Sequence, residues 1–475
     1  MKKNIPTLAI IGIGILLFSL TIGVVGLVDS YFYINLGWYF YSGHTDPINP
    51  YNLTKPQTLF GPVYGLIIAP LQKNPLPIAI VAIPFFQISI LFVSAYLIYL
   101  ILKTLLRKPY PLLGAMIFFL LPFNLIYATF IMAETLTEFF VALYAYLLFR
   151  ILNKSKGAHP SQLVLVAALA TLTRNAMVPL LVVALIHWIT TVPRDIRHVS
   201  RPSNTIKIAL SHIPAVIGIA VLALWMLFNY RLVGKFELST HTGRHLYNNV
   251  VDTGHFLPAP GNPTLAPFLK RIPESDMFQP WWNAMLIFND GIIPETKVDK
   301  MMFDVSIAAI LHQPLAYTAH VANMAIETPK TPPLHPDNLA SNYFACANDT
   351  CTKCVDEPWH YCWDRNICEP LVKICPVQTA WASWITGSTA LYPWISLIIF
   401  AIGLVGCVFA CIKGPTFFRW VAGLFIILHL FQSSTEWIEG RFIIPLYPLY
   451  AILIVVGVQH VVSLIRLFRV RGEHH

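Results

Sequence analysis

The sequence predicts an all-α protein that crosses a membrane about ten times. Of its 475 residues, 56% are apolar and only 12% are charged, and the mean hydropathy is +0.62. Soluble domains carry about 25% charged residues, so this composition indicates a polytopic membrane protein. The lysines and arginines behind the net charge of +9 lie in short stretches between long apolar runs. That arrangement is typical of loops that face anionic lipid, and it argues against a nucleic-acid partner.

The first predicted span covers residues 8–28, an almost uncharged run that is long enough to cross a bilayer as a helix. A basic start precedes this run but no small-residue cleavage site follows it, so we expect an uncleaved span and not a signal peptide. A first outer loop, residues 29–76, comes next. Its segment 58–71 is apolar but short, and it is broken by Pro62 and Pro70. These features predict an interfacial or re-entrant piece.

Nine further spans follow from apolar runs that end at charged or turn-forming residues. They cover residues 77–102, 111–129, 132–152, 163–172, 176–191, 208–228, 391–411, 420–432 and 442–467. Basic loops alternate with loops that have no excess of Lys and Arg, which places both termini in the cytoplasm by the positive-inside rule. The chain then divides into an N-terminal transmembrane module (1–230), a large outward hydrophilic region (231–385) and C-terminal transmembrane helices (386–475).

Six of the eight cysteines fall within one short stretch of the outward region. They are Cys346, Cys351, Cys354, Cys362, Cys368 and Cys375. An even number of cysteines in a loop-rich stretch of an oxidising compartment predicts disulfides whose pairing the sequence leaves open. A zinc site made of Cys351, Cys354 and His360 is the alternative, although its spacing fits no standard zinc pattern. In either case we expect the segment to staple a subdomain and not to form a catalytic centre.

Asp29 stands where the first predicted span meets water, next to an aromatic stretch that begins at Tyr31. A carboxylate at this depth is unfavourable unless it reaches water or a partner, so it is a candidate site residue. The alternative is an ordinary solvated carboxylate beside an aromatic belt.

Other ionisable residues gather at the outward ends of the predicted spans. They are Glu134, Glu138, Arg174, Arg231, Lys235, His241, Arg244, His245, Glu439 and Arg441. Each has an ordinary explanation when taken alone, because arginines at helix ends snorkel to the interface. Together they place guanidinium groups and acids in one outward layer. Such a layer suits an anionic headgroup, since arginine binds phosphate oxygens in a bidentate manner, and Asp29 would add a base beside it.

Five short motifs carry a resemblance to a known family. They are Asp29-Ser30-Tyr31, Gly61-Pro62-Val63-Tyr64-Gly65-Leu66, Ala133-Glu134-Thr135-Leu136, Leu172-Thr173-Arg174 and Glu439-Gly440-Arg441-Phe442-Ile443-Ile444-Pro445. In their order and side of the membrane they resemble membrane-embedded glycosyltransferases of the GT-C type, particularly the protein O-mannosyltransferases and the lipid A aminoarabinose transferases. The chain departs from some members at Ser30, where those members have a second adjacent carboxylate. The six-cysteine segment matches no feature of the family.

The resemblance implies a GT-C-like fold and a sugar transfer, with inversion, from a polyprenyl-phosphate donor to a lipid, glycan or protein acceptor. It implies Asp29 as the general base, and Arg441, Arg231 and Lys235 as ligands of the donor phosphate. Substrate contacts or supporting roles are implied for Glu134, Arg174, Tyr31, Tyr64, Glu439 and Arg244. No cofactor is required, although Asp29 and Asp46 are compatible with a shared divalent metal. We expect a bacterial inner membrane, with the site facing the periplasm.

Two other functions compete with this one. A transporter or flippase of a lipid-linked sugar explains the same phosphate-binding layer without chemistry, but it predicts ionisable residues near the bilayer midplane and paired broken helices. A non-catalytic scaffold whose cysteine-rich loop recruits a partner leaves Asp29 and the arginine layer unexplained. An alanine at Asp29 separates the three, because only an enzyme loses turnover while it still binds the donor.

Overall fold

The computed structural model describes residues 28–43, 58, 60–72, 76–121, 124–197, 202–270, 277, 295–331, 391–435 and 440–472, and for residues 28–31 it describes the backbone only. The secondary structure in these ranges is helical, which confirms the predicted all-α class. The first predicted span up to residue 27, Asp46, Glu439 and the cysteines between 346 and 375 lie outside the described residues.

Seven described helices are long and apolar enough to cross a membrane. They are α4 (Leu76–Leu105), α7 (Glu134–Leu152), α9 (Val178–Arg197), α10 (Pro202–Val233), α19 (Tyr392–Lys413), α20 (Thr416–Thr435) and α21 (Tyr447–Gly472). At about 1.5 Å per residue, helices of this length match a hydrocarbon core of about 30 Å. The prediction of a multi-pass integral membrane protein is confirmed at this level.

Two other predicted spans correspond to helices that are too short to cross a membrane. α8 (Pro160–Thr173) ends where the backbone of Arg174 becomes extended. The predicted span 111–129 is divided into α5 (Tyr110–Leu120) and the single turn α6 (Asn124–Tyr127). Leu121 precedes a proline and is extended, with φ −55° and ψ 137°, because a following proline disfavours the helical conformation. The side chain of Asn124 donates a 2.7 Å hydrogen bond to the carbonyl of Phe118 and so satisfies the open helix end.

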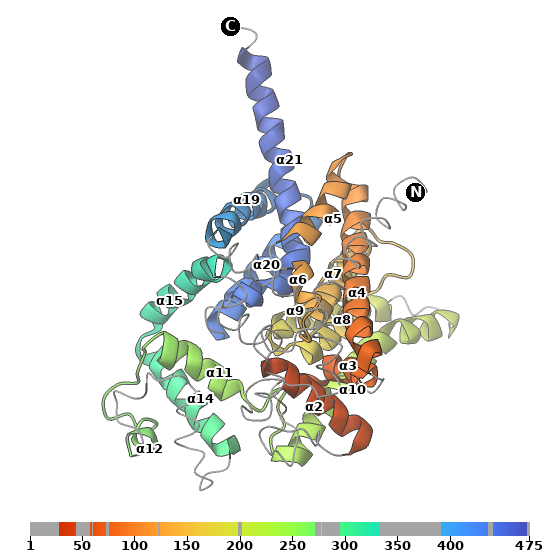
Figure 1. The fold of residues 1–475 in the computed structure, drawn as a ribbon. Helices are drawn as coiled ribbons and strands as arrows, with labels where there is room; N and C mark the ends of the chain where they lie inside the picture. The colour runs from red at the N-terminus through yellow and green to blue at the C-terminus, as the bar shows by residue number, and fades with distance from the viewer. Residues whose placement is uncertain are drawn as a thin grey trace.

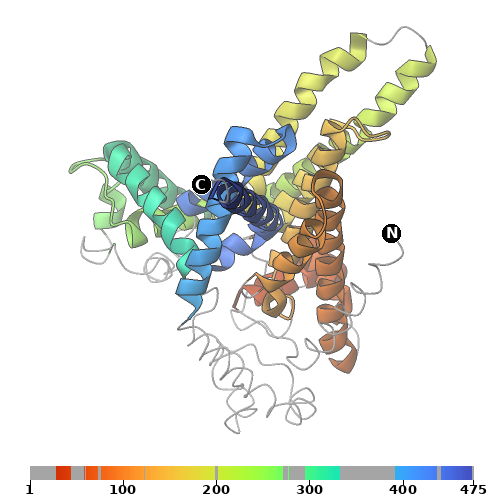
Figure 2. The same ribbon diagram turned by 90° about the horizontal axis from the view of Figure 1, so that it is seen from above.

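The helices form one bundle. α21 is the most deeply buried of the seven candidate membrane helices, because 89% of its most apolar segment is buried inside the protein. α19 packs on α21, α4 packs on α5 and α7, and α8 packs on α9 and α10. The α19–α21 contact is close enough that a Cβ at Gly406 would lie 1.8 Å from the carbonyl oxygen of Leu453. Small residues allow this kind of approach between membrane helices. Seen from above, the α9–α10 pair reaches away from the rest of the bundle (Figure 2).

The two ends of the bundle differ in chemistry. Lys103, Arg150 and Arg419 lie near one end, which we call the basic end. There the rings of Phe149 and Phe417 pack edge to face at 5.4 Å and join the end of α7 to the start of α20. The opposite end carries α2 (Val28–Ser42), α3 (Pro62–Gln72), α11 (Thr242–Tyr247) and α14 (Glu295–His312), at the bottom of Figure 1. We call it the site end.

The described part of the hydrophilic region has a small core of its own, formed by Tyr247, Val250, Val251, Val298, Met302 and their neighbours. Three hydrogen bonds attach this region to the last turns of α20. Tyr317 of α15 (Pro314–Glu327) donates to the carbonyl of Ser434 at 2.6 Å, and Asn249 donates to that of Ser433 at 3.2 Å. The ring of His429 bonds the carbonyl of Ala325 at 2.8 Å. The hydrophilic region is therefore docked on the bundle at the site end.

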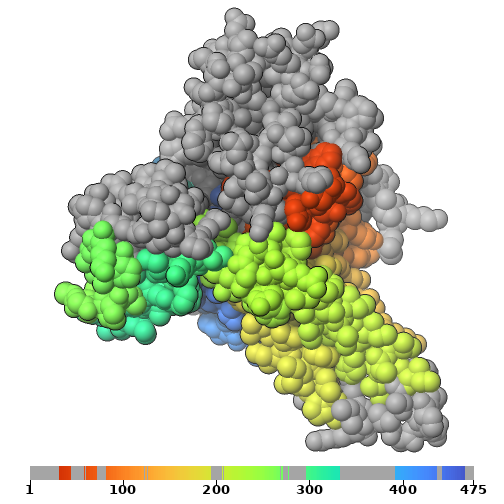
Figure 3. All heavy atoms as spheres, turned by 90° about the horizontal axis from the view of Figure 1, so that it is seen from below, coloured from red at the N-terminus to blue at the C-terminus, as the bar shows by residue number. Residues whose placement is uncertain are grey.

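The first outer loop contributes α3, an apolar helix of 11 residues that begins at Pro62. It is too short to span a membrane, as the sequence predicts. α3 packs against α2, and Tyr33 of α2 stacks on Phe60 at 4.6 Å. In the view from the site end, the segment that follows α10 lies between α2 and α14 (Figure 3).

Candidate functional site

A buried ion pair joins two helix ends at the site end of the bundle. Nη1 of Arg174 lies 2.5 Å from Oε1 of Glu134. Glu134 is the first residue of α7 and is 1% exposed, while Arg174 follows the last residue of α8 and is 8% exposed. The extended backbone at Arg174 ends α8 next to the start of α7. A pair this deep is strongly coupled, because removing either partner leaves an uncompensated charge in an apolar interior.

The ring of Phe442 connects this pair to Arg441. The guanidinium carbon of Arg174 lies 4.9 Å from the ring centroid, and that of Arg441 lies 5.3 Å from it. Both distances fall within the range of a cation–π interaction. Arg441 is 9% exposed and stands in η7 (Gly440–Leu446), the turn that leads into α21. The structure therefore brings together Glu134, Arg174 and Arg441, which the sequence places in one layer.

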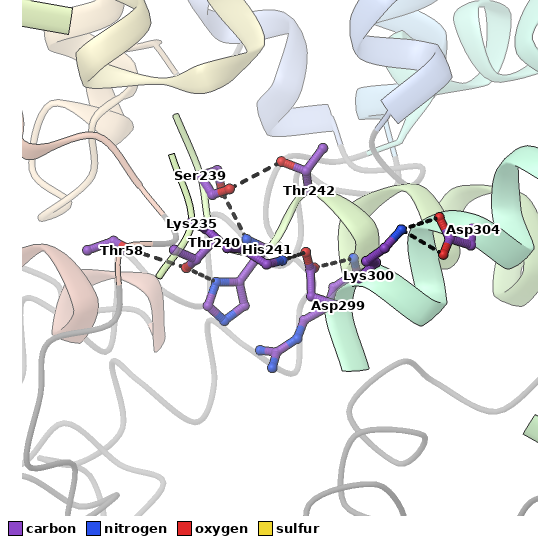
Figure 4. Close-up of polar contacts among 10 residues, drawn as sticks. Thr58, Lys235, Ser239, Thr240, His241, Thr242, Asp299, Lys300 and Asp304 are labelled. Atoms are coloured by element: carbon purple, nitrogen blue, oxygen red, sulfur yellow. Dashed lines mark hydrogen bonds and ion pairs between the residues drawn. The ribbon is translucent and has the colours of Figure 1, made fainter. Parts of the chain in front are cut away.

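A second polar cluster follows the end of α10 (Figure 4). The Thr58 hydroxyl donates a hydrogen bond to the Thr240 hydroxyl at 3.2 Å, and Thr240 bonds Nδ1 of His241 at 2.7 Å. The backbone N–H of His241 donates to the hydroxyl of Ser239 at 3.2 Å. All four side chains are buried. The sequence does not predict that these side chains form a cluster, because isolated serines and threonines are common in loops.

Lys235 and Arg244 meet at Asp299 in α14. The Lys235 ammonium lies 2.9 Å from Oδ2 of Asp299, and the backbone N–H of Arg244 donates to Oδ1 at 3.0 Å. Asp299 is 2% exposed. The predicted phosphate ligand Lys235 is thus engaged in an ion pair that fixes the segment after α10 to α14. Lys300, the residue after Asp299, forms an exposed pair with Asp304 at 3.0 Å.

A short segment of the first outer loop touches both clusters. Thr58 bonds Thr240 in the second cluster, as described above. A Cβ at Gly61 would lie 1.9 Å from the carbonyl oxygen of Leu172, two residues before Arg174. The backbone at Gly61 therefore rests directly on the end of α8. Thr58 and Gly61, three positions apart in the chain, thus contact the region of His241 and the region of Arg174 respectively.

The other predicted site residues lie in different surroundings. Tyr64 is fully buried, and its hydroxyl donates to Oε1 of Gln87 at 3.2 Å, so it ties α3 to α4. Arg231 lies exposed near the end of α10. Asp29 and Tyr31 belong to the first turn of α2, where only the backbone is described. The predicted contact residue Glu439 lies outside the described residues.

Several buried polar side chains at this end lack a hydrogen-bond partner among the described residues, and Glu138 and Gln432 are two of them. Both carboxylate oxygens of Glu138, one turn after Glu134, lack a hydrogen bond, and so do both amide atoms of Gln432. Glu138 is 0% and Gln432 is 3% exposed. The sequence singles out Glu138 without a role. It gives no signal for Gln432, a glutamine near the end of a predicted span.

Metal ligands do not gather in the described ranges, where no three His, Cys, Asp or Glu side chains lie close enough to hold an ion. Asp46 and the candidate set Cys351, Cys354 and His360 lie outside those ranges. Cys407 and Cys411 of α19 are free thiols.

Comparison of this chain with models of protein families, with curated proteins and with solved structures yields no match.

Proposed function

We propose that this protein transfers a sugar from a polyprenyl-phosphate donor to a lipid, glycan or protein acceptor at the site end. The observation that carries the proposal is the pair of buried guanidinium groups, Arg174 and Arg441, on the ring of Phe442. Cations at the ends of apolar helices suit a ligand that has an anionic head and an isoprenoid tail. Away from bulk water, a guanidinium–phosphate contact is also stronger than at an open surface.

Arg441 is the proposed ligand of the donor phosphate. It would stabilise the charge that grows on the phosphate oxygen as the bond to the sugar breaks. Arg174 is already neutralised by Glu134, so its proposed role is to position Phe442 and the start of α7. Lys235 is held by Asp299 and drops out of the proposed phosphate ligands. Arg231, which is exposed, remains a candidate for outer contacts with the headgroup.

Asp29 is the proposed general base. In this mechanism its carboxylate takes the proton of the acceptor hydroxyl or amine while that atom bonds to the anomeric carbon. The bond from the anomeric carbon to the phosphate oxygen breaks with inversion, and polyprenyl phosphate leaves with the electron pair. The packing of α2 against α3, together with the contact of Gly61 with Leu172, supports this role because it brings the helix of Asp29 to the elements that hold Arg174.

The placement of the acids favours transfer at a surface over transport through the bilayer. Glu134 and Glu138 occupy the first five residues of α7, close to one end of this 19-residue helix. A translocation pathway calls for ionisable groups near the middle of the membrane. We also propose that the protein lies in a bacterial inner membrane, with its site end at the periplasmic face.

Sugar transfer in liposomes tests the proposal. Purified protein is incubated with a panel of radiolabelled polyprenyl-phosphate monosaccharides and candidate acceptors, and wild type is compared with Asp29→Asn. The matched control is Asp304→Asn, which alters an exposed carboxylate of α14. We expect Asp29→Asn to lose at least about 100-fold in turnover while it retains donor binding, and the control to match wild type. Donor binding without transfer by wild type would favour a flippase, and no donor binding would refute the proposal.

A further inference from the structure

The packing of the described helices gives the carboxyl group of Glu138 no structural role. It is 0% exposed, and neither of its oxygens has a hydrogen-bond partner in the described part of the chain. An isolated carboxyl in an apolar interior is costly, and an ionisable residue within a membrane helix marks a functional site by default. The second oxygen of Glu134, one turn closer to the surface, is also unsatisfied. The start of α7 therefore carries several hydrogen-bond acceptor atoms that have no donor among the described residues.

Gln432 lies at a similar depth on the neighbouring helix α20. The ring contact between Phe149 and Phe417 fixes the level of the two helices at the basic end. From there, Glu134 and Gln432 each lie fifteen residues along their own helix toward the site end. At about 1.5 Å per residue both travel the same distance, so Gln432 is about level with Glu134. Both helices also contact η7, which carries Arg441.

Gln432 and Glu138 face the same helix, α21. Gln432 lies two turns from Phe425 and therefore on the same side of α20. Phe425 stacks on Tyr450 of α21 at 5.4 Å. α7, which carries Glu138, also packs on α21. The helices that carry Glu138 and Gln432 therefore both pack on α21 and on η7, the turn that holds Arg441.

The chemistry of the unsatisfied atoms narrows the ligand class. The carboxylate oxygens of Glu138 and Oε1 of Gln432 accept hydrogen bonds, Nε2 of Gln432 donates them, and the hydroxyl of Tyr450, which also lacks a partner among the described residues, does both. A metal ion or an ammonium group satisfies acceptors only. A hydroxyl group both donates and accepts, so a polyhydroxylated ligand satisfies the whole set.

We propose that Glu138 and Gln432 bind the hydroxyl groups of the donor sugar beside Arg441, which holds its phosphate, with Gln432 at the level of Glu134 and Glu138 one helical turn deeper. This inference rests on the proposed function, because it divides one donor between two parts of the site. Arg441 recognises the phosphate that every polyprenyl-phosphate donor shares, and the layer of Glu138 and Gln432 distinguishes one sugar from another.

Binding measurements with two lipids test the inference. Dissociation constants are measured in detergent for sugar-free polyprenyl phosphate and for the polyprenyl-phosphate monosaccharide that wild type binds most tightly. We expect Glu138→Leu and Gln432→Leu to weaken binding of the sugar-bearing lipid at least about tenfold, the size of one good buried hydrogen-bond contact. Binding of sugar-free polyprenyl phosphate should stay within about twofold of wild type. Arg441→Ala should weaken both lipids.

Two further variants guard against misfolding. Glu138→Gln keeps the size of the side chain, and we expect it to weaken the sugar-bearing lipid less than Glu138→Leu does. Thr137→Val is the matched control on the same helix, because the Thr137 hydroxyl already bonds the carbonyl of Ala133 within α7. Both variants should melt near the wild-type temperature, and Thr137→Val should bind both lipids as wild type does.

The outcomes separate failure of this inference from failure of the proposed function. If the Glu138 and Gln432 variants bind the sugar-bearing lipid as tightly as wild type, or lose both lipids equally, the layer holds internal water only and the inference is refuted while donor binding stands. If wild type binds neither lipid, the proposed function falls, and the inference falls with it.

Discussion

Arg174 and Glu134 form a buried ion pair, 2.5 Å long, between residues that are 40 positions apart in the chain. The pair holds the end of α8 against the beginning of α7. Because Phe442 covers the same guanidinium group, the pair also sets the position of η7. One contact thus controls the relative placement of three elements at the site end.

The stability of the bundle should depend on this pair as a unit. We expect Glu134→Ala or Arg174→Ala to destabilise the protein by about 3–5 kcal/mol, because each leaves a buried charge without a partner. The double variant Glu134→Leu with Arg174→Met should recover much of the loss, since it removes both charges. Thermal unfolding in detergent measures the effect, and Lys300→Ala, in an exposed pair, should cost at most about 0.5 kcal/mol. Simple addition of the two single effects in the double variant would contradict the coupling.

The hydrogen bond between Thr58 and Thr240 should hold the first outer loop in place. Thr240→Val removes a hydroxyl that serves both Thr58 and His241, and we expect a loss of about 1–3 kcal/mol because buried groups are left unsatisfied. Hydrogen exchange should become faster in residues 58–64 and 239–245. Thr318→Val, whose exposed hydroxyl bonds only within its own helix, is the control. Unchanged exchange in the Thr240 variant would show that the loop is held by other contacts.

The docked hydrophilic region should loosen in mild acid. Burial lowers the pKa of His320 in α15, a hydrogen bond with the backbone of Asn249 opposes this shift, and the charge of His255 adds to it. In the unfolded chain histidine titrates near about 6.5, so the unfolded state takes up a proton before the folded state does. The stability that His320 provides is therefore complete above about pH 6.5 and declines as the pH falls below it.

Thermal unfolding at pH 7.5 and pH 5.5 measures this decline. His320→Phe keeps a ring against Phe256 and Tyr317, which lie 5.5 and 6.2 Å from the imidazole. The variant should lose less stability between the two pH values than wild type does. An equal loss in both proteins would assign the acid sensitivity to other groups.

The orientation of the bundle can be tested with single introduced cysteines. Pro263→Cys places a thiol in the hydrophilic region at the site end, and Lys156→Cys places one in the loop after α7 at the basic end; both positions are exposed. We expect a membrane-impermeant maleimide added to intact cells or spheroplasts to label the first variant above the unsubstituted background. The second should be labelled only after the membrane is permeabilised. The reverse pattern would invert the assigned topology.

Hydropathy and loop charge account for much of the fold. They predict most of the described membrane helices because length and apolar composition are local properties of the chain. They also place Glu134, Arg174 and Arg441 at one level, since sidedness alone sets the depth of a helix end. The predicted span 111–129 shows the limit of hydropathy as a predictor. Its apolar run continues past Pro122, whereas the helix ends at Leu120 because Leu121, which precedes that proline, is extended.

Lateral neighbours are harder to predict than depth. The engagement of Lys235 by Asp299 depends on how α14 folds back over the segment after α10, 64 residues earlier in the chain. Gln432 has no distinctive sequence context, and its isolation is a property of the packed bundle. For Asp29, the sequence argument remains a prediction, because the structure describes its backbone alone.

The near contact of Gly406 with the Leu453 backbone bears on how the proposed lipid donor would reach the site end. At this contact the backbones of α19 and α21 leave no space for an isoprenoid chain to pass between them. The surface of α10 is open, since only 22% of the most apolar segment of this helix is buried by other parts of the protein. A donor diffusing in the bilayer would therefore approach from the side of α10, and bulky substitutions there would slow loading without altering the affinity of the occupied site.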